Sequence, residues 1–212
     1  MTARSDDKSA ASDASDAERQ PQGTRSRILD VAERLVQVRG FNGFSYADIA
    51  TELGVTKASL HYHFPTKASL GEALVARYAE RFARALEGID ARVAPASAKL
   101  AAYAKLYADV LREGRMCLCG MLAAEHETLS TPIREAVVSF LDDNEAWLEG
   151  VLVQGREDGS LHFGRSPEDT ARSVISGLEG AMLVARSYGD VERFERGSTQ
   201  LLAGLTGAGE AA

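Results

Sequence analysis

The first regular pattern of hydrophobic and polar positions begins at Thr24, where apolar residues start to recur at helical spacing. Ile28, Val31 and Leu35 fall on one stripe of such a helix, with polar and charged residues between them. The pattern stops at Gly40, a residue type that commonly ends helices because it tolerates the left-handed backbone conformation. The spacing therefore predicts a first amphipathic helix between Thr24 and Gly40.

Two shorter apolar patterns follow, each with its own start and stop signals. Ser45 and a carboxylate three residues later have the spacing of a capping box, in which a serine hydroxyl accepts a hydrogen bond from an otherwise unpaired backbone amide. Gly54 ends this helix, Thr56 can cap the next one, and Pro65 prevents that one from continuing far. The signals predict two short helices around a tight turn, the second over 57–64.

The rest of the chain is also helical in its spacing. A long fourth helix is predicted after Thr66 from apolar residues that repeat every four positions: Leu70, Leu74, Tyr78, Phe82 and Leu86. Beyond Pro95 the helical segments are 97–113, 118–128, 132–157, 167–188 and 190–205. No strand pattern or internal repeat appears, so an all-α fold is expected.

The same patterns divide the chain into four segments. Residues 1–23 consist largely of small and polar residues, cannot bury enough apolar surface to order themselves, and are expected to form a disordered arm. A three-helix domain over 24–67, a larger helical domain over 68–206 and a flexible tail over 207–212 are predicted after it.

Charge is unevenly distributed between these segments. The whole chain has 24 Lys and Arg against 31 Asp and Glu, a formal net charge of −7, which argues against a polyanionic partner. Residues 24–67, however, carry six basic and four acidic side chains. An excess of two is also within ordinary surface variation, but any nucleic acid that binds is expected to bind there.

The two short helices, joined through Leu53-Gly54-Val55, have the pattern of a helix-turn-helix, in which the first helix braces the second so that its exposed face can enter the major groove. Leu60 and Phe64 are expected to point inward. The residues left outward are Thr56, Lys57, Ala58, Ser59, His61, Tyr62 and His63. Lysine and hydroxyl groups can bind phosphates and base edges, so this face favours DNA over the structural bundles that share the spacing.

The residues of this region closely resemble the N-terminal domain of the tetracycline-repressor (TetR) family. The matching runs are Arg39-Gly40-Phe41, Phe44-Ser45-Tyr46-Ala47-Asp48-Ile49-Ala50 and Gly54-Val55-Thr56-Lys57-Ala58-Ser59-Leu60-His61-Tyr62-His63-Phe64-Pro65-Thr66-Lys67. The resemblance weakens after Phe82. It implies an N-terminal three-helix DNA-binding domain followed by a C-terminal helical domain for ligand binding and dimerisation.

The resemblance also implies roles for single residues. Ser45 and Tyr46 would anchor the start of the second helix and a phosphate beside it. The residues implied to face bases or nearby phosphates are Thr56, Lys57, Ala58, Ser59 and His61, and those implied to contact the phosphate backbone are Tyr62, His63, Lys67, Arg25 and Arg27. Because Ala58 and Ser59 are small, much of the base specificity is expected from Lys57 and from DNA shape.

Aromatic and sulfur-containing residues cluster in the second domain and can supply the adaptable apolar walls of a ligand pocket. Each of them taken singly is more commonly a core residue, but as a set they predict a cavity for a small-molecule effector. The residues expected to line it are Tyr103, Tyr107, Met116, Cys117, Met121, Phe140, Trp147 and Met182.

Cys117 and Cys119 allow a second interpretation, a thiol-based regulator that responds to redox change, electrophiles or a metal. The alternative, two buried cysteines that behave as small hydrophobes, is favoured, because two thiols and the distant His126 leave a zinc site incomplete. His61 and His63 diverge by about 200° on one helix and cannot share an ion. Neither a metal nor a cofactor is expected.

The last two helices, rich in small and apolar residues, are implied by the resemblance to meet a second copy as a four-helix bundle. Such a homodimer would place two recognition helices about 34–36 Å apart, the spacing needed to read a palindromic operator on double-stranded DNA. An effector that spreads them would release a repressor from that operator.

Other protein classes receive less support from the sequence. An all-α hydrolase or transferase is disfavoured because no glycine-rich phosphate loop, nucleophile elbow or His-Glu-x-x-His zinc helix is present, so the chain is not expected to be an enzyme. No apolar run approaches the roughly 18 residues that span a bilayer, and no signal-peptide pattern begins the chain. A cytoplasmic protein without a membrane partner is expected.

Overall fold

The computed structural model describes residues 10–92 and 95–206, with side chains from residue 23 onward. Within these ranges the chain forms helices and no strand, which confirms the all-α prediction. The α-helices are α1 (Ala10–Arg39), α2 (Tyr46–Leu53), α3 (Lys57–His63), α4 (Lys67–Arg92), α5 (Ala96–Arg112), α6 (Leu118–Ala124), α7 (Thr131–Glu157), α8 (Pro167–Tyr188) and α9 (Val191–Ala203), and one short 3-10 helix, η1 (His126–Thr128), follows α6.

Most helices begin and end close to the residues that the sequence pattern predicts, but the start of α1 differs. α1 begins at Ala10, so its first turns overlap the arm expected over 1–23. Residues 1–9 of that arm and the tail expected over 207–212 lie outside the described residues.

Local chemistry explains where the N-terminal helices stop and start. Gly40 and Gly54 follow α1 and α2 with φ angles of 84° and 67°, a left-handed conformation that a side chain would disfavour. The Asp48 carboxylate accepts hydrogen bonds from both the backbone N–H and the hydroxyl of Ser45, each at 2.7 Å, and thereby holds the start of α2. These contacts fix the angle between the short helices.

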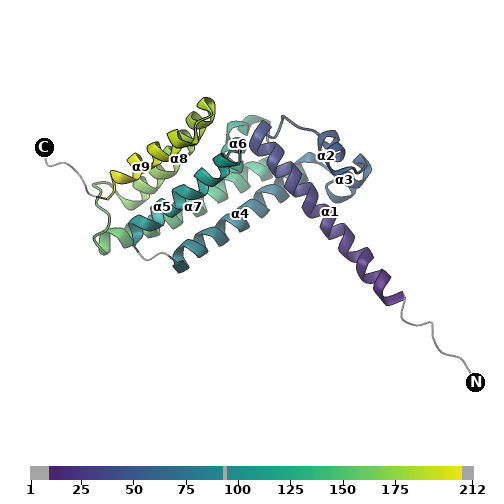
Figure 1. The fold of residues 1–212 in the computed structure, drawn as a ribbon, viewed down its shortest axis with the longest axis horizontal. Helices are drawn as coiled ribbons and strands as arrows, with labels where there is room; N and C mark the ends of the chain where they lie inside the picture. Colours follow the sequence, from purple (N-terminus) through teal and green to yellow (C-terminus); the bar gives the residue numbers. More distant parts are fainter. Residues whose placement is uncertain (1–9, 93–94, 207–212) are drawn as a thin grey trace, which may run out of the picture.

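The molecule has a head, which we define as residues 24–67, and a body, which comprises residues 68–206. α2 and α3 lie beside α1 at one end of the molecule, and α4 leads from them into the body (Figure 1). α8 and α9 form an outer layer that packs on α5 and α7, on the side of the body away from α4 (Figure 1). Among the described helices none is long and apolar enough to cross a membrane.

Ion pairs join the head to α4. Glu33 on α1 is buried and accepts a hydrogen bond from the Arg77 guanidinium at 2.9 Å. Arg81, one turn further along α4, pairs with the same carboxylate, and Arg77 also reaches Asp30 at 2.7 Å. Because both arginines pair with one buried carboxylate, they fix the position of α1 along α4.

A second set of contacts joins the head to α6 and α8. Glu125, directly after α6, accepts hydrogen bonds from the backbone amides of Phe41 at 2.6 Å and Asn42 at 3.2 Å. Near the end of α1, Arg186 of α8 donates to the carbonyl oxygen of Gln37 at 3.2 Å and to that of Val38. We call Glu125 and Arg186, with these partners, the latch. It connects the loop before α2 to the centre of the body.

Candidate DNA-binding interface and effector cavity

The orientation of α3 is determined by one cap and two buried side chains. The Thr56 hydroxyl accepts a hydrogen bond from the Ser59 backbone N–H at 3.2 Å, which begins the helix. Leu60 and Phe64 are 0% and 2% exposed and pack into the head, as the spacing predicted. The opposite face of α3 consequently points to solvent.

Side chains suited to DNA lie on this outward face of α3. Tyr62 is 79% exposed, the largest exposed fraction among the large hydrophobic side chains described. Of the residues over 56–63 that are expected to contact DNA, Ser59 and His63 are half-buried, and the exposed ones are Thr56, Lys57, Ala58, His61 and Tyr62. A surface with a lysine, hydroxyls and ring nitrogens can donate to phosphates and base edges.

Two arginines add positive charge near the end of α3. Arg25 and Arg27 are both exposed on α1. The Arg25 guanidinium lies 5.0 Å from the centre of the Phe64 ring, which positions the cation close to the last turn of α3. Arg25 is thus available to a phosphate that flanks the recognition helix.

Tyr46 is engaged within the head. Its hydroxyl lies 2.8 Å from the Phe64 carbonyl oxygen and 2.7 Å from that of Thr66, and can donate its one proton to either. Its ring lies 4.8 Å from that of His61. Burial raises the pKa of Tyr46 to about 12, so the hydroxyl stays protonated. The side chain joins the start of α2 to the end of α3.

Lys67 also points inward, unlike the phosphate contact that the family resemblance implies. Its Nζ donates to the Phe44 carbonyl oxygen at 2.5 Å and lies 4.3 Å and 4.9 Å from the ring centres of Phe44 and Phe41. Burial lowers the pKa of Lys67. The observed contacts give the lysine a role in holding the start of α4 to the loop before α2.

Most of the expected effector residues form a packed core instead of lining a described cavity. The Tyr103 ring stacks on that of Trp147, with 5.5 Å between the ring centres, and the Tyr103 hydroxyl lies 3.1 Å from that of Tyr107. The Phe140 ring packs against that of Phe82, with 5.3 Å between the ring centres. Met182 is buried as well, and its sulfur accepts a hydrogen bond from the Cys117 N–H at 3.3 Å. These side chains fill the centre of the bundle with one another.

A cavity of about 370 Å³ lies beside that core, between α6, α7 and α8. Of the expected residues only Met116 and Met121 line it. Cys119, Glu145 and Glu179 contribute the ionisable groups of its wall. The cavity has the size and largely apolar wall of a small-molecule site.

The two thiols are placed as hydrophobic core groups. Cys117 and Cys119 are 2% and 0% exposed, and the Tyr78 hydroxyl lies 3.8 Å from the Cys117 sulfur. Burial raises the pKa of both thiols, which disfavours the reactive thiolate form. No group of three or more His, Cys, Asp and Glu side chains in the described part of the chain is placed to hold a metal ion. The structure does not favour a thiol- or metal-based sensor.

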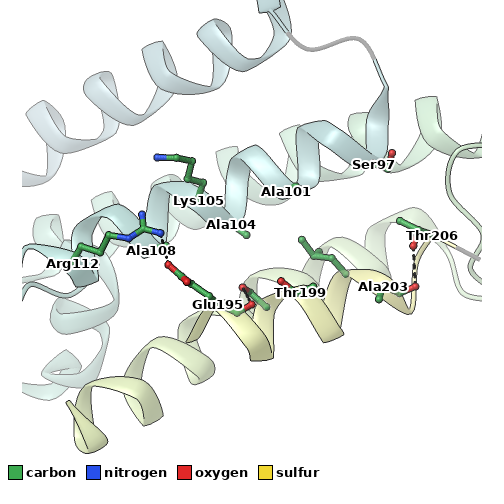
Figure 2. Close-up of a pocket in the computed structure, with 12 residues that line it drawn as sticks. Ser97, Ala101, Ala104, Lys105, Ala108, Arg112, Glu195, Thr199, Ala203 and Thr206 are labelled. Carbon is green, nitrogen blue, oxygen red and sulfur yellow. Dashed lines mark hydrogen bonds and ion pairs between the residues drawn. The ribbon is translucent and has the colours of Figure 1, made fainter. Parts of the chain in front are cut away.

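A second cavity, of about 380 Å³, lies between α5 and α9 (Figure 2). Small side chains of α5, among them Ala101, Ala104 and Ala108, face α9 across it (Figure 2). An ion pair between Arg112 and Glu195 bridges the two helices at one end. None of the residues expected to bind an effector lines this second cavity.

Sequence reasoning missed the latch and Glu179. Glu179 shares a helical stripe with Ile175, Leu178 and Met182, which are all buried, so a carboxylate within an apolar stripe was the available signal. Glu125 and Arg186 gave no comparable signal, because their partners are backbone groups distant in the sequence.

A helix-turn-helix that presents a basic, hydroxyl-rich face, carried by a helical body with a cavity of small-molecule size, defines a DNA-binding transcriptional regulator. The family model described as "Bacterial regulatory proteins, tetR family" matches residues 28–74, and that described as "Tetracyclin repressor-like, C-terminal domain" matches residues 96–201. The chain belongs to the TetR family. The family consists of transcriptional regulators, which fits the expectation that this chain is not an enzyme.

Individual relatives agree with this assignment over most of their length. A TetR-family regulator from Agrobacterium tumefaciens superposes with a TM-score of 0.85 at 29% identity, over 88% of this chain and 99% of the other. A regulator from Legionella pneumophila gives a TM-score of 0.74 at 34% identity, over 84% and 95%. The transcriptional repressor DhaR of Mycobacterium sp. strain GP1 is 24% identical, over 75% of this chain and 80% of DhaR.

Proposed function

We propose that the protein is a repressor that binds a palindromic operator as a homodimer and releases it when a small molecule enters the cavity between α6, α7 and α8. The latch is the observation that supports this most. α6 forms much of the cavity wall and leads directly into Glu125, which holds the amides of Phe41 and Asn42 before α2. A ligand that moves α6 would therefore act on the head.

The exposed face of α8 supports the homodimer. Leu183, Val184 and Tyr188 are 59%, 48% and 67% exposed, which is unusual for neighbouring apolar side chains on a surface. Gly180 is exposed beside them, and because Gly180 and Leu183 also line the cavity between α6, α7 and α8, a second copy on this face would cover one edge of that cavity. We infer that a second copy of α8 and α9 covers this face and sets the spacing of the two α3 helices.

The experiment is a titration of labelled DNA from upstream of the protein's own gene, followed by fluorescence anisotropy. We expect binding that a scrambled sequence does not reproduce, two chains per site, and reversal by small-molecule extracts. The regulator would act in the cytoplasm, where bacterial operators are.

A pair of lysine variants makes this titration specific. Lys57→Ala should weaken binding about fivefold or more, since it removes a contact from the recognition helix. Lys105→Ala removes an exposed lysine from α5, distant in the fold from α3, and should change nothing. Equal losses for the two variants, or equal affinity for scrambled DNA, would contradict the proposed interface.

A further inference from the structure

The cavity between α6, α7 and α8 has a mostly apolar wall. The large apolar side chains that line it are Met116, Met121, Leu141, Ile175 and Leu183. Its volume of about 370 Å³ is within the range of sites that hold drug-sized molecules. Methionine side chains can adjust to ligands of different outline, because they are unbranched and polarisable. An apolar molecular body therefore suits this wall.

The charged groups of the cavity are all of one sign. Glu145 and Glu179 line it, whereas no Lys, Arg or His is among its described lining residues. The Glu145 carboxylate lies 3.4 Å from the Arg172 guanidinium, which also pairs with Glu168 at 2.6 Å, so the charge of Glu145 is compensated in part. The Oε1 atom of Glu179 is shielded from solvent and has no hydrogen-bond partner among the described residues, and the one donor to this carboxylate is the neutral thiol of Cys117. A shielded acceptor without a donor is costly, and a ligand with a donor removes that cost.

A second basic residue beside this wall, Arg186, does not neutralise Glu179. Arg186 touches the Met121 sulfur at 3.5 Å, but its guanidinium donates to the carbonyl oxygens of Gln37 and Val38 in the latch. An anionic ligand would thus meet an uncompensated carboxylate in a site of low dielectric constant, which is strongly unfavourable.

We propose that this cavity binds an organic cation, namely an apolar molecule with one protonated amine whose ammonium group donates a hydrogen bond to the Glu179 carboxylate. The inference rests on the proposed function only in treating this ligand as the effector. Burial raises the pKa of Glu179, and a bound ammonium would offset that cost of ionisation by supplying an opposite charge.

The geometry around Gly120 supports a fixed position for the carboxylate. A Cβ atom added at Gly120 would lie 2.4 Å from Oε2 of Glu179, closer than any ordinary contact. The glycine consequently leaves room for the carboxylate against α6. Gly120→Ala should push the Glu179 carboxylate from this position without removing its charge. The variant therefore distinguishes the effect of the carboxylate's position from the effect of its charge.

The test is isothermal titration calorimetry of the full-length protein, without DNA, against three probes of one skeleton: 4-phenylbutylamine, 4-phenylbutanol and 4-phenylbutanoate. We expect the amine to bind most tightly and the carboxylate most weakly. Glu179→Gln should weaken the amine about 10- to 100-fold and leave the alcohol nearly unchanged, since it removes one charge-assisted hydrogen bond. Gly120→Ala should also lower the ratio of amine affinity to alcohol affinity, as Glu179→Gln does.

Glu157→Gln is the matched control, because that glutamate is exposed at the end of α7 and does not line the cavity. It should change amine affinity by less than about threefold. Thermal melts of each variant show whether the chain is folded.

Four results would overturn the cation site: binding of none of the probes, preference for the carboxylate, an unchanged amine affinity in folded Glu179→Gln, or binding only to dissociated monomers. Binding of the amine without release of operator DNA in the anisotropy titration would leave the cation site supported. That outcome would contradict only the proposed release mechanism.

Discussion

The head and the body place their functional groups in opposite environments. In the head, Lys57 and Tyr62 are exposed on one short helix, a few residues from the cap that orients them. In the body, Met121 and Glu179 come from helices far apart in the sequence and line a cavity. Surface chemistry on a helix follows from local spacing, whereas cavity chemistry depends on how whole helices pack. The latch is where the two regions depend on each other.

The largest effect is expected from breaking the latch with Glu125→Ala. The variant leaves the amides of Phe41 and Asn42 without their charged acceptor, so the loop before α2 should loosen and α3 should lose its fixed position. Affinity for the upstream DNA should fall about tenfold or more, since each hydrogen bond to a charged group contributes about 1.5–3 kcal/mol. Fluorescence anisotropy measures the loss.

Glu127→Ala is the control for the latch, because that glutamate lies two residues further on and is exposed on η1. It should bind DNA as the unaltered protein does. An undiminished affinity in Glu125→Ala, with helix content intact by circular dichroism, would mean that head and body are not coupled through this contact.

The next effect distinguishes two lysines within the head. Lys67→Met removes the hydrogen bond to Phe44 and the contacts with two rings, and should lower the free energy of unfolding by about 1–2 kcal/mol. Lys57→Met should leave stability unchanged but reduce the salt dependence of DNA binding by about one unit of slope. Denaturant melts and salt titrations measure the two quantities.

The family resemblance predicts the reverse for Lys67, a loss in salt slope with little change in stability. Tyr62→Ala supplies the reference for a surface contact, since this 79% exposed side chain should weaken binding to every DNA sequence without destabilising the head. If Lys67→Met behaves like Tyr62→Ala, the lysine leaves its inward position when DNA is bound.

The sequence was sufficient to predict the all-α fold, the ends of α2 and α3 and the buried side of α3, because caps, glycines and apolar spacing act over a few residues. It was insufficient for the effector site. Tyr103, Tyr107 and Phe140 are buried, but spacing cannot reveal that all three rings pack against Phe82. Nor can it reveal that Tyr46 has its acceptors 18 and 20 residues away.

The smallest effect is expected from Glu179→Gln on stability, and it depends on pH. Burial raises the pKa of Glu179 above its ordinary value of 4.5, against a smaller opposing effect of Cys117. Below that value the carboxyl is protonated in both the folded and the unfolded chain. As the pH rises through it, the unfolded chain ionises first, so the folded protein loses stability until its own carboxyl also ionises.

A glutamine at this position avoids the loss. Glu179→Gln should therefore match the unaltered protein near pH 4 and exceed it at neutral pH by about 1 kcal/mol, or about 2–4 °C in Tm. Thermal melts at several pH values measure the difference, with the exposed Glu135→Gln of α7 as the control that should show none. Parallel curves for Glu179→Gln and the unaltered protein would mean that the carboxylate already has a cationic partner. A gain in stability together with a loss of amine affinity would show that the body keeps an unpaired charge for its ligand.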